Sequence, residues 1–268
     1  MHDDSTDVME SEEEYEAFYE SLGKSYPESQ VVYEEALGRA RRAIVRSYLE
    51  RFSAQGLTLL DVGCNSGEYT LFYASLGREV WGIDISRSLV ATAVSRANQL
   101  NLRNASFEVA NVETYRGGPY DAILFSEVLE HLRNPATALE SLARCLRPGG
   151  FLLLTTPAPI REDQTFASFV MDRLLRRDLV RAKVHKSEGT RIREYVSGAY
   201  HYRHDEYYPI PLACWVATFG FRCVRAGSFF TTERYLRHLN RVPRLQSRMP
   251  LISLLGLNNL HLFERIET

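Results

Sequence analysis

The feature that most constrains this chain is residues 57–77, where a short apolar run enters a glycine-bearing turn and then a helical pattern. The mostly apolar run 57–62 is too short for a helix and predicts a buried strand. After Gly67, apolar side chains recur at helical spacing up to Gly77, which suits a helix C-terminus. Glycines in the turn let a ligand approach the backbone closely, and the N–H groups at the helix start favour an anionic group. The stretch therefore predicts a strand, a ligand-binding loop and a helix.

An acidic residue at the end of the next predicted strand narrows the ligand to a nucleoside. Asp84 ends the strand and lies 23 positions after Asp61, close to the spacing at which a carboxylate meets ribose hydroxyls. The loop reads Gly-Cys-Asn-Ser-Gly, so Asn65 stands where a dinucleotide site has its second glycine for contact with pyrophosphate. This favours a nucleoside without phosphates over NAD.

Strand and helix patterns then alternate along the chain, which predicts an α/β fold with a doubly wound, mostly parallel sheet. In such a sheet a ligand binds beyond the carboxyl ends of the strands. At this edge, in or just after the ends of predicted strands, lie Asp61, Gly63, Asp84, Asn111 and Glu127. The expected strands are 57–62, 79–84, 106–110, 120–125, 151–156, 221–230 and 260–266, and the expected helices are 67–76, 87–100, 136–146 and 210–219.

Four segments in this order resemble the motifs of class I S-adenosylmethionine-dependent methyltransferases, of the ubiquinone-biosynthesis-like, small-molecule type. They are 61–67, 80–86, 120–132 and 146–151, and the resemblance covers residues 57–157. It implies a seven-stranded Rossmann-like methyltransferase sheet in the order 3-2-1-4-5-7-6 with the seventh strand antiparallel. It also implies S-adenosyl-L-methionine as the cofactor.

The resemblance assigns roles to the residues at the strand ends. Asp61 would orient the binding loop, Asp84 would bind the ribose, and Asn111 stands where the family often has an aspartate that contacts the adenine amino group. Asp61 has a structural alternative as an acceptor of backbone N–H groups, and Asp84 one as a charge at a helix N-terminus. The full set of implied cofactor residues is Asp61, Gly63, Cys64, Asn65, Gly67, Asp84, Ile85, Asn111, Val112, Ser126 and Glu127.

Histidines are the candidate catalytic residues. Methyl transfer from a sulfonium is an in-line displacement that needs a positioned nucleophile and sometimes the removal of a proton. A neutral imidazole titrates near neutrality, which makes His131 the leading base, with His201 and His204 as alternatives. A structural alternative is that His131 lies on a helix surface. The stretch 195–208, rich in tyrosine and histidine, either lines an acceptor pocket or is an ordinary half-buried loop.

A metal site is a second possibility at the same place. Glu127, Glu130 and His131 are spaced i, i+3 and i+4, so on a helix they would share one face and could bind a divalent cation. RNA-terminal 2′-O-methyltransferases of the small-RNA type use a similar set with a later histidine to hold Mg²⁺, a part that His201 or His204 could take here. The same residues are common in small-molecule methyltransferases, where the acids can simply cap and position.

The domain organisation expected is an acidic tail and helical cap at 1–56, then a methyltransferase domain at 57–268 with an insertion at about 158–206, which is mostly helical up to Leu179. The aromatic first helix either packs on the sheet or, as the resemblance suggests, covers the substrate. The second helix, about 31–52, directs its arginines mostly outward: Arg39, Arg41, Arg42 and Arg46.

Composition limits the partners. The net charge of −2 gives no general reason to expect nucleic acid, and no apolar run is long enough for a membrane span. Seven arginines in 222–250 form a solvated surface or attract an anionic substrate or RNA. The four cysteines show no metal spacing and no signal peptide is visible, which predicts a cytoplasmic protein with reduced thiols.

The prediction is a methyltransferase that acts on a small-molecule acceptor, at oxygen in preference to nitrogen or carbon. The alternatives are a metal-dependent RNA 2′-O-methyltransferase and a catalytically silent cofactor-binding or scaffold protein.

Overall fold

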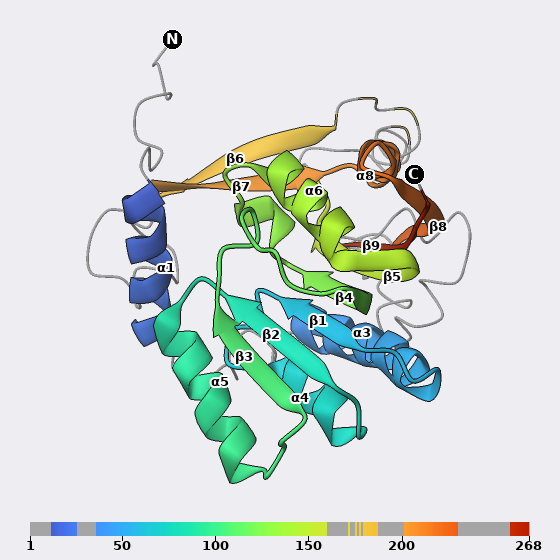
Figure 1. The fold of residues 1–268 in the computed structure, drawn as a ribbon. Coiled ribbons are helices and arrows are strands. Elements are labelled where there is room, and N and C mark those ends of the chain that lie inside the picture. The colour runs from blue at the N-terminus through green and yellow to red at the C-terminus, as the bar shows by residue number, and fades with distance from the viewer. Residues whose placement is uncertain are drawn as a thin grey trace.

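A seven-stranded sheet forms the centre of the computed structural model (Figure 1). The strand order is β3-β2-β1-β4-β5-β9-β8; neighbours from β3 to β5 are parallel, and β9 is antiparallel to both β5 and β8. The strands are β1 (Leu59–Val62), β2 (Val80–Asp84), β3 (Ala105–Val109), β4 (Tyr120–Ser126), β5 (Leu146–Pro157), β8 (Phe221–Phe229) and β9 (Asn258–Arg265). The structure describes residues 12–25, 36–159, 171, 175, 177, 179–186, 201–229 and 258–267.

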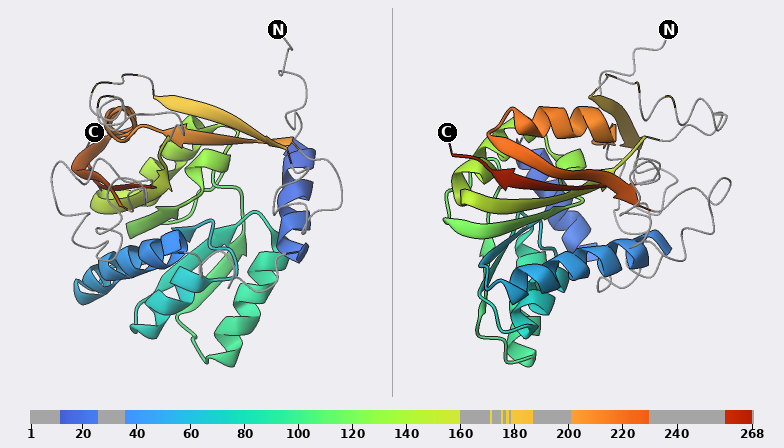
Figure 2. Two further views of the ribbon diagram at one scale, coloured as in Figure 1. Left: turned by 180° about the vertical axis from the view of Figure 1, so that it is seen from behind. Right: turned by 90° about the vertical axis from the view of Figure 1, so that its right-hand side faces the viewer.

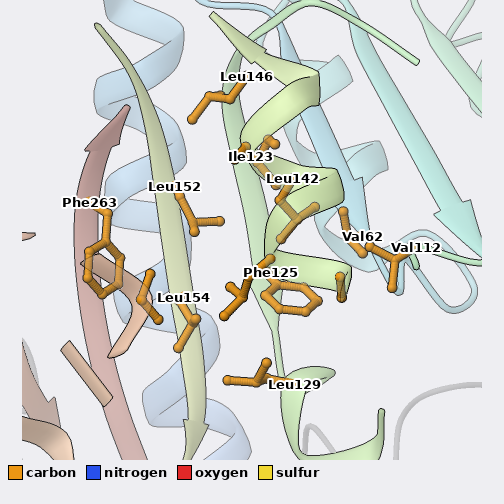
Figure 3. Close-up of a cluster of buried hydrophobic side chains, with 14 of the residues drawn as sticks. Val62, Val112, Ile123, Phe125, Leu129, Leu142, Leu146, Leu152, Leu154 and Phe263 are labelled. Carbon is orange, nitrogen blue, oxygen red and sulfur yellow. The ribbon is translucent and has the colours of Figure 1, made fainter. Parts of the chain in front are cut away.

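Helices cover both faces of this sheet (Figure 2). They are α1 (Glu12–Ser25), α3 (Ala36–Ala54), α4 (Glu68–Ser75), α5 (Arg87–Gln99), α6 (Pro135–Cys145) and α8 (Pro209–Ala217), with a short 3₁₀ helix, η1 (Leu129–His131), after β4. One buried cluster lies between the sheet and helices α6 and α8; Phe125, Leu142 and Leu154 belong to it (Figure 3). A second lies under α3 and α4 and includes Ile44, Leu49 and Tyr73.

The two clusters follow from side-chain alternation along each strand. On β5, Leu152 and Leu154 belong to the α6 and α8 side, whereas Leu153 belongs to the α3 and α4 side. All three are fully buried, as expected for a parallel sheet covered on both faces. The strand order confirms the predicted 3-2-1-4-5-7-6 arrangement, with β9 as the antiparallel seventh strand.

The predicted insertion contains two strands that were not predicted. Its described part has helical residues at 171 and 175 and then an antiparallel pair, β6 (Val180–Lys186) and β7 (His201–Tyr207). Leu179, assigned to the helical part, directly precedes β6. Most of 160–178 lies outside the described residues, as do 1–11 and 231–256. The boundaries at 56 and at 158–206 remain predictions.

Two peripheral elements lie toward the carboxyl ends of the central strands. Strand β7 contacts η1 and also β5, and α1 packs against α5 (Figure 1). Both therefore border the edge where the sequence predicts the ligand. Within the described part of the chain, no helix is both long enough and apolar enough to cross a bilayer.

Candidate active site

A pocket lies at the carboxyl ends of β1, β2 and β4, and most of the predicted ligand-binding residues line it. Helix α1 contributes Tyr15 and Tyr19 to its wall, and α3 contributes Arg41. Its predicted members are Asp61, Gly63, Cys64, Asn65, Asp84, Ile85, Asn111, Val112, Ser126, Glu127 and His131, while Gly67 supports the turn from outside the wall. One cavity therefore contains both the strand-end residues and the leading catalytic histidine.

The turn after β1 needs left-handed backbone at three positions. Gly63 has φ +68°, and a Cβ there would lie 2.4 Å from Val128 Cγ2. Gly67 has φ +87° at the N-terminus of α4. Asn65 has φ +51°, a conformation that asparagine tolerates better than most residues, and its Oδ1 accepts from Ser66 N at 2.6 Å. Asn65 thus adopts the conformation that a middle glycine would supply.

Asp84 joins this turn to the start of α5. Its Oδ2 accepts from Asn65 N and its Oδ1 from Ser86 N, each at 2.9 Å. Burial raises the pKa of Asp84, and the hydrogen bonds from Ser86 and Asn65 oppose that shift. The carboxylate is therefore fixed in the wall of the pocket, at the carboxyl end of β2.

Asp61 is buried at the end of β1, where Thr70 Oγ1 donates to its Oδ2 at 2.6 Å. Burial raises the pKa of Asp61 to about 7, against the opposing effect of the hydrogen bond from Thr70. Its charge therefore changes within the neutral pH range. Nearby, burial raises the pKa of the Cys64 thiol, so this cysteine stays protonated in the pocket.

The turn after β3 supplies the remaining strand-end residues. Asn111 uses its Oδ1 to accept from Glu113 N at 2.9 Å, which makes its side chain part of the turn. Ile85 and Val112 present apolar side chains to the same part of the pocket. The arrangement suits a flat purine between two apolar residues.

Arg41 lines the pocket. The prediction that its side chain points outward from the helix was wrong. Its side chain is 10% exposed and forms an ion pair with Glu127. Leu37, Arg41, Ile44 and Tyr48 are spaced i, i+4, i+7 and i+11, so helical periodicity places Arg41 on the apolar face of α3. The spacing could have identified it. The other predicted outward arginines differ: Arg42 and Arg46 are partly exposed and pair with Glu68 of α4.

The predicted helix carrying Glu127, Glu130 and His131 on one face does not form. Glu127 has φ +57° and precedes the three-residue η1, so the i, i+3, i+4 relation does not apply. Thr155 Oγ1 donates to Glu127 Oε1, and Thr156 Oγ1 donates to Glu130 Oε2, each at 3.0 Å. Adjacent strand residues point to opposite faces, so these two carboxylates are bound on opposite faces of β5.

His131 faces the pocket with several neighbours around it. Tyr15 Oη donates to the His131 carbonyl at 3.2 Å, and the Tyr19 ring lies 6.1 Å from the imidazole. Behind it, Glu130 Oε1 lies 3.9 Å from His131 Nε2, and the His204 ring centre is 5.0 Å away. Glu130 is fully buried, which raises its pKa. The side chain of the third candidate, His201, lies outside the described residues.

Comparisons with known proteins agree with this geometry. A family model described as a methyltransferase domain matches residues 37–224, which is most of the chain. The chain belongs to this family. The match spans the strand-end turns, η1 and the described part of the insertion.

Individual relatives cover less of the chain. The ubiquinone biosynthesis O-methyltransferase of Caulobacter vibrioides is 34% identical over 128 residues, covering 47% of this chain and 49% of the relative. The chain thus matches about half the length of such relatives.

Solved structures show the same fold. The 1,6-didemethyltoxoflavin-N1-methyltransferase of Burkholderia thailandensis superposes with a TM-score of 0.61 at 17% identity, over 97% of this chain and 92% of that one. The magnesium protoporphyrin IX methyltransferase of Synechocystis gives 0.57 at 19% identity, over 93% and 94%.

Proposed function

We propose that this protein transfers the methyl group of S-adenosylmethionine to an oxygen atom of a small molecule. The observation that carries the proposal is that one pocket has residues suited to a nucleoside at one end and His131 at the other. The two ends are named here the cofactor end (Asp61, Gly63, Asn65, Asp84 and Asn111) and the acceptor end (Tyr15, Tyr19, His131 and Leu132).

The cofactor end has the chemistry that an uncharged nucleoside needs. Asp84 offers carboxylate oxygens to ribose hydroxyls, and Ile85 and Val112 offer apolar contact to a purine. Arg41 and Glu127 form a pair of opposite charges beside Ser126. A methionine group also carries one carboxylate and one ammonium, so Arg41 and Glu127 match it in charge. When bound, the cofactor supplies a methyl group on a sulfonium sulfur.

The acceptor end offers a base and aromatic walls. His131 is placed to take the proton of an acceptor hydroxyl, while Tyr15 and Tyr19 of α1 exclude water from that end. Aromatic side chains favour a flat, largely apolar acceptor. The ubiquinone biosynthesis O-methyltransferases are named for transfer to oxygen, which supports the choice of atom.

The experiment is a radiolabel transfer assay with a panel of phenolic, amine and carboxylate acceptors, run beside calorimetric titration with S-adenosylhomocysteine. We expect micromolar cofactor binding and turnover with at least one hydroxyl acceptor. Tight cofactor binding without turnover on any acceptor would favour the catalytically silent alternative. Turnover only on RNA, with strong salt sensitivity, would favour the RNA methyltransferase.

A cation at the acceptor end is a second candidate, because single donor atoms of Glu130, His131 and His204 lie within 4.8 Å of one another. The residues do not fit Mg²⁺, which prefers oxygen ligands, since two of the three donors are imidazoles and Glu127 is bound to Arg41. Such a set suits a transition metal. Chelation followed by reloading with Zn²⁺, Mn²⁺ or Mg²⁺ separates this candidate from the metal-free base.

We also expect a reducing, cytoplasmic location. All four cysteines, Cys64, Cys145, Cys214 and Cys223, are free thiols. Fractionation of the native host tests the location.

A further inference from the structure

Glu127 is held more firmly than its place in a turn requires. Its carboxylate accepts from Asn258 Nδ2 at 2.8 Å and 2.9 Å, one contact to each oxygen, and from Thr155 Oγ1 at 3.0 Å. It also forms the ion pair with Arg41. Its backbone has φ +57°, a strained conformation that persists only where surrounding contacts enforce it.

Asn258 reaches this carboxylate from 131 positions along the chain. It is the first residue of β9, is buried, and points to the same face of the sheet as Leu260, the face covered by α3. Its neighbour Asn259 points to the other face, where its Nδ2 donates to the Tyr207 carbonyl at 2.7 Å. The two buried amides therefore serve different parts of the molecule.

We infer that Asn258 is a positioning residue of the methyl-transfer site, which sets the Glu127–Arg41 pair to receive the amino-acid end of the cofactor. The inference rests on the proposed function. Both members of the pair line the pocket beside Ser126. A zwitterionic amino acid carries a carboxylate and an ammonium close together, so an adjacent cation and anion held in fixed positions can bind both of its charges. By donating to both oxygens, Asn258 fixes the carboxylate about which Arg41 is oriented.

The consequence is selectivity for the intact cofactor. Ligands with the methionine end depend on the position of this pair, whereas ligands that carry only the nucleoside depend on Asp84 and its neighbours. Asn258→Asp keeps the shape of the side chain but places a second carboxylate against Glu127. Like charges at this separation repel, so Glu127 and Arg41 shift from their positions.

The test compares two ligands by calorimetry: S-adenosylhomocysteine, which has the amino-acid end, and 5′-methylthioadenosine, which lacks it. We expect Asn258→Asp to weaken S-adenosylhomocysteine about tenfold or more, the loss of roughly one charge-assisted hydrogen bond, and to leave 5′-methylthioadenosine within twofold. In turnover, the KM for the cofactor should rise more than kcat falls. Equal weakening of both ligands, or lower thermal stability without a change in selectivity, overturns the inference.

Two further variants keep the test decisive. Asn259→Asp is the matched control: it should lower stability through the lost bond to Tyr207 and leave the ratio of the two affinities unchanged. Thr155→Val removes another donor to Glu127 with little change in shape, and should give the same selectivity in weaker form if Asn258→Asp fails to fold. Wild-type protein that binds neither ligand contradicts the proposed function itself, which distinguishes the two failures.

Discussion

The cofactor end of the pocket takes its residues from the carboxyl ends of successive strands, whereas the acceptor end is assembled from segments far apart in the chain. Asp61 and Asp84 lie at the carboxyl ends of β1 and β2, and Asn111 lies just after β3. In contrast, His131 at the acceptor end meets Tyr15 from 116 positions away. The local sequence around each strand end determines the cofactor end, whereas tertiary packing determines the acceptor end.

The comparison predicts that each end can be disabled separately, and loss of the base gives the largest effect. His131→Gln should lower kcat about 10²–10⁴-fold, because no base remains to take the proton from the substrate hydroxyl. Cofactor affinity should stay within twofold. Steady-state kinetics and calorimetry measure both. His261→Gln is the control imidazole, since His261 is buried on β9 and bonds to the Pro209 carbonyl away from the pocket. An unchanged kcat in His131→Gln contradicts its role as the base.

Two buried groups should give the ligand-free protein opposite pH dependences. The pKa of Asp61 is raised from 3.8 to about 7 by burial, so the folded state binds more protons than the unfolded state between these values, and this group's contribution to stability falls as pH rises. The pKa of His261 is lowered from 6.5 to about 4, again by burial, so its contribution falls as pH drops through that window. Over its full range the effect is about 4 kcal/mol for Asp61 and about 3 kcal/mol for His261.

Urea unfolding from pH 4 to pH 8 separates these contributions. Relative to wild type, Asp61→Asn should gain stability as pH rises toward 8, and His261→Gln should gain as pH drops toward 4. Parallel curves for wild type and either variant would show that the group does not titrate as its burial implies. Because Asp61 lines the pocket, ionisation of its buried carboxyl lowers the stability of the folded state at the cofactor end.

Loss of the ribose carboxylate should weaken cofactor binding. Asp84→Asn should raise the Kd for S-adenosylhomocysteine about 10- to 100-fold, because hydrogen bonds to a charged carboxylate contribute roughly 1.5–3 kcal/mol. Asp121→Asn is the matched control. Like Asp84, Asp121 is a carboxylate that accepts from a backbone N–H group, that of Thr58, and it also accepts from the Thr58 hydroxyl. It lies at the amino end of β4, on the side of the sheet away from the pocket. Calorimetry that finds equal affinity in Asp84→Asn and wild type removes the ribose assignment.

The smallest effect expected is at the junction between α1 and the acceptor end. Tyr15→Phe removes the donor to the His131 carbonyl, a bond of 3.2 Å contributing about 0.5–1.5 kcal/mol. The KM for the acceptor should rise severalfold while cofactor affinity stays constant. A change in cofactor affinity without a change in the KM for the acceptor would contradict the placement of α1 at the acceptor end.

The same contrast decides how much could be predicted from the sequence. The residues that line the cofactor end were predictable because each motif is local: an apolar run, a turn with Gly63 and Asn65, and an acid at the end of β2. The strand order was predicted from the family resemblance that these motifs carry. Asn65 shows how local this is, since its left-handed backbone takes the place of a glycine within one turn.

The acceptor end and the Glu127–Arg41 pair were only partly predictable. His131 was identified, but its helix was not formed, because Glu127 leaves β4 with left-handed backbone and is bound by Asn258 and Arg41. No local pattern marks Asn258, whose role depends on β9 lying beside β5. The spacing of Arg41 from Ile44 and Tyr48 did indicate the apolar face of α3, but we predicted an outward position because arginine is charged. The β6–β7 pair was missed because strand pairing joins segments separated by residues 187–200.

The measurement that tests the central claim most directly is a crystal structure with S-adenosylhomocysteine bound. We expect adenosine at the carboxyl ends of β1 and β2 with its ribose hydroxyls on Asp84, the amino-acid end against the Arg41–Glu127 pair, and the sulfur facing His131. Density for the ligand elsewhere, or a pocket that takes a dinucleotide and excludes this ligand, would contradict it.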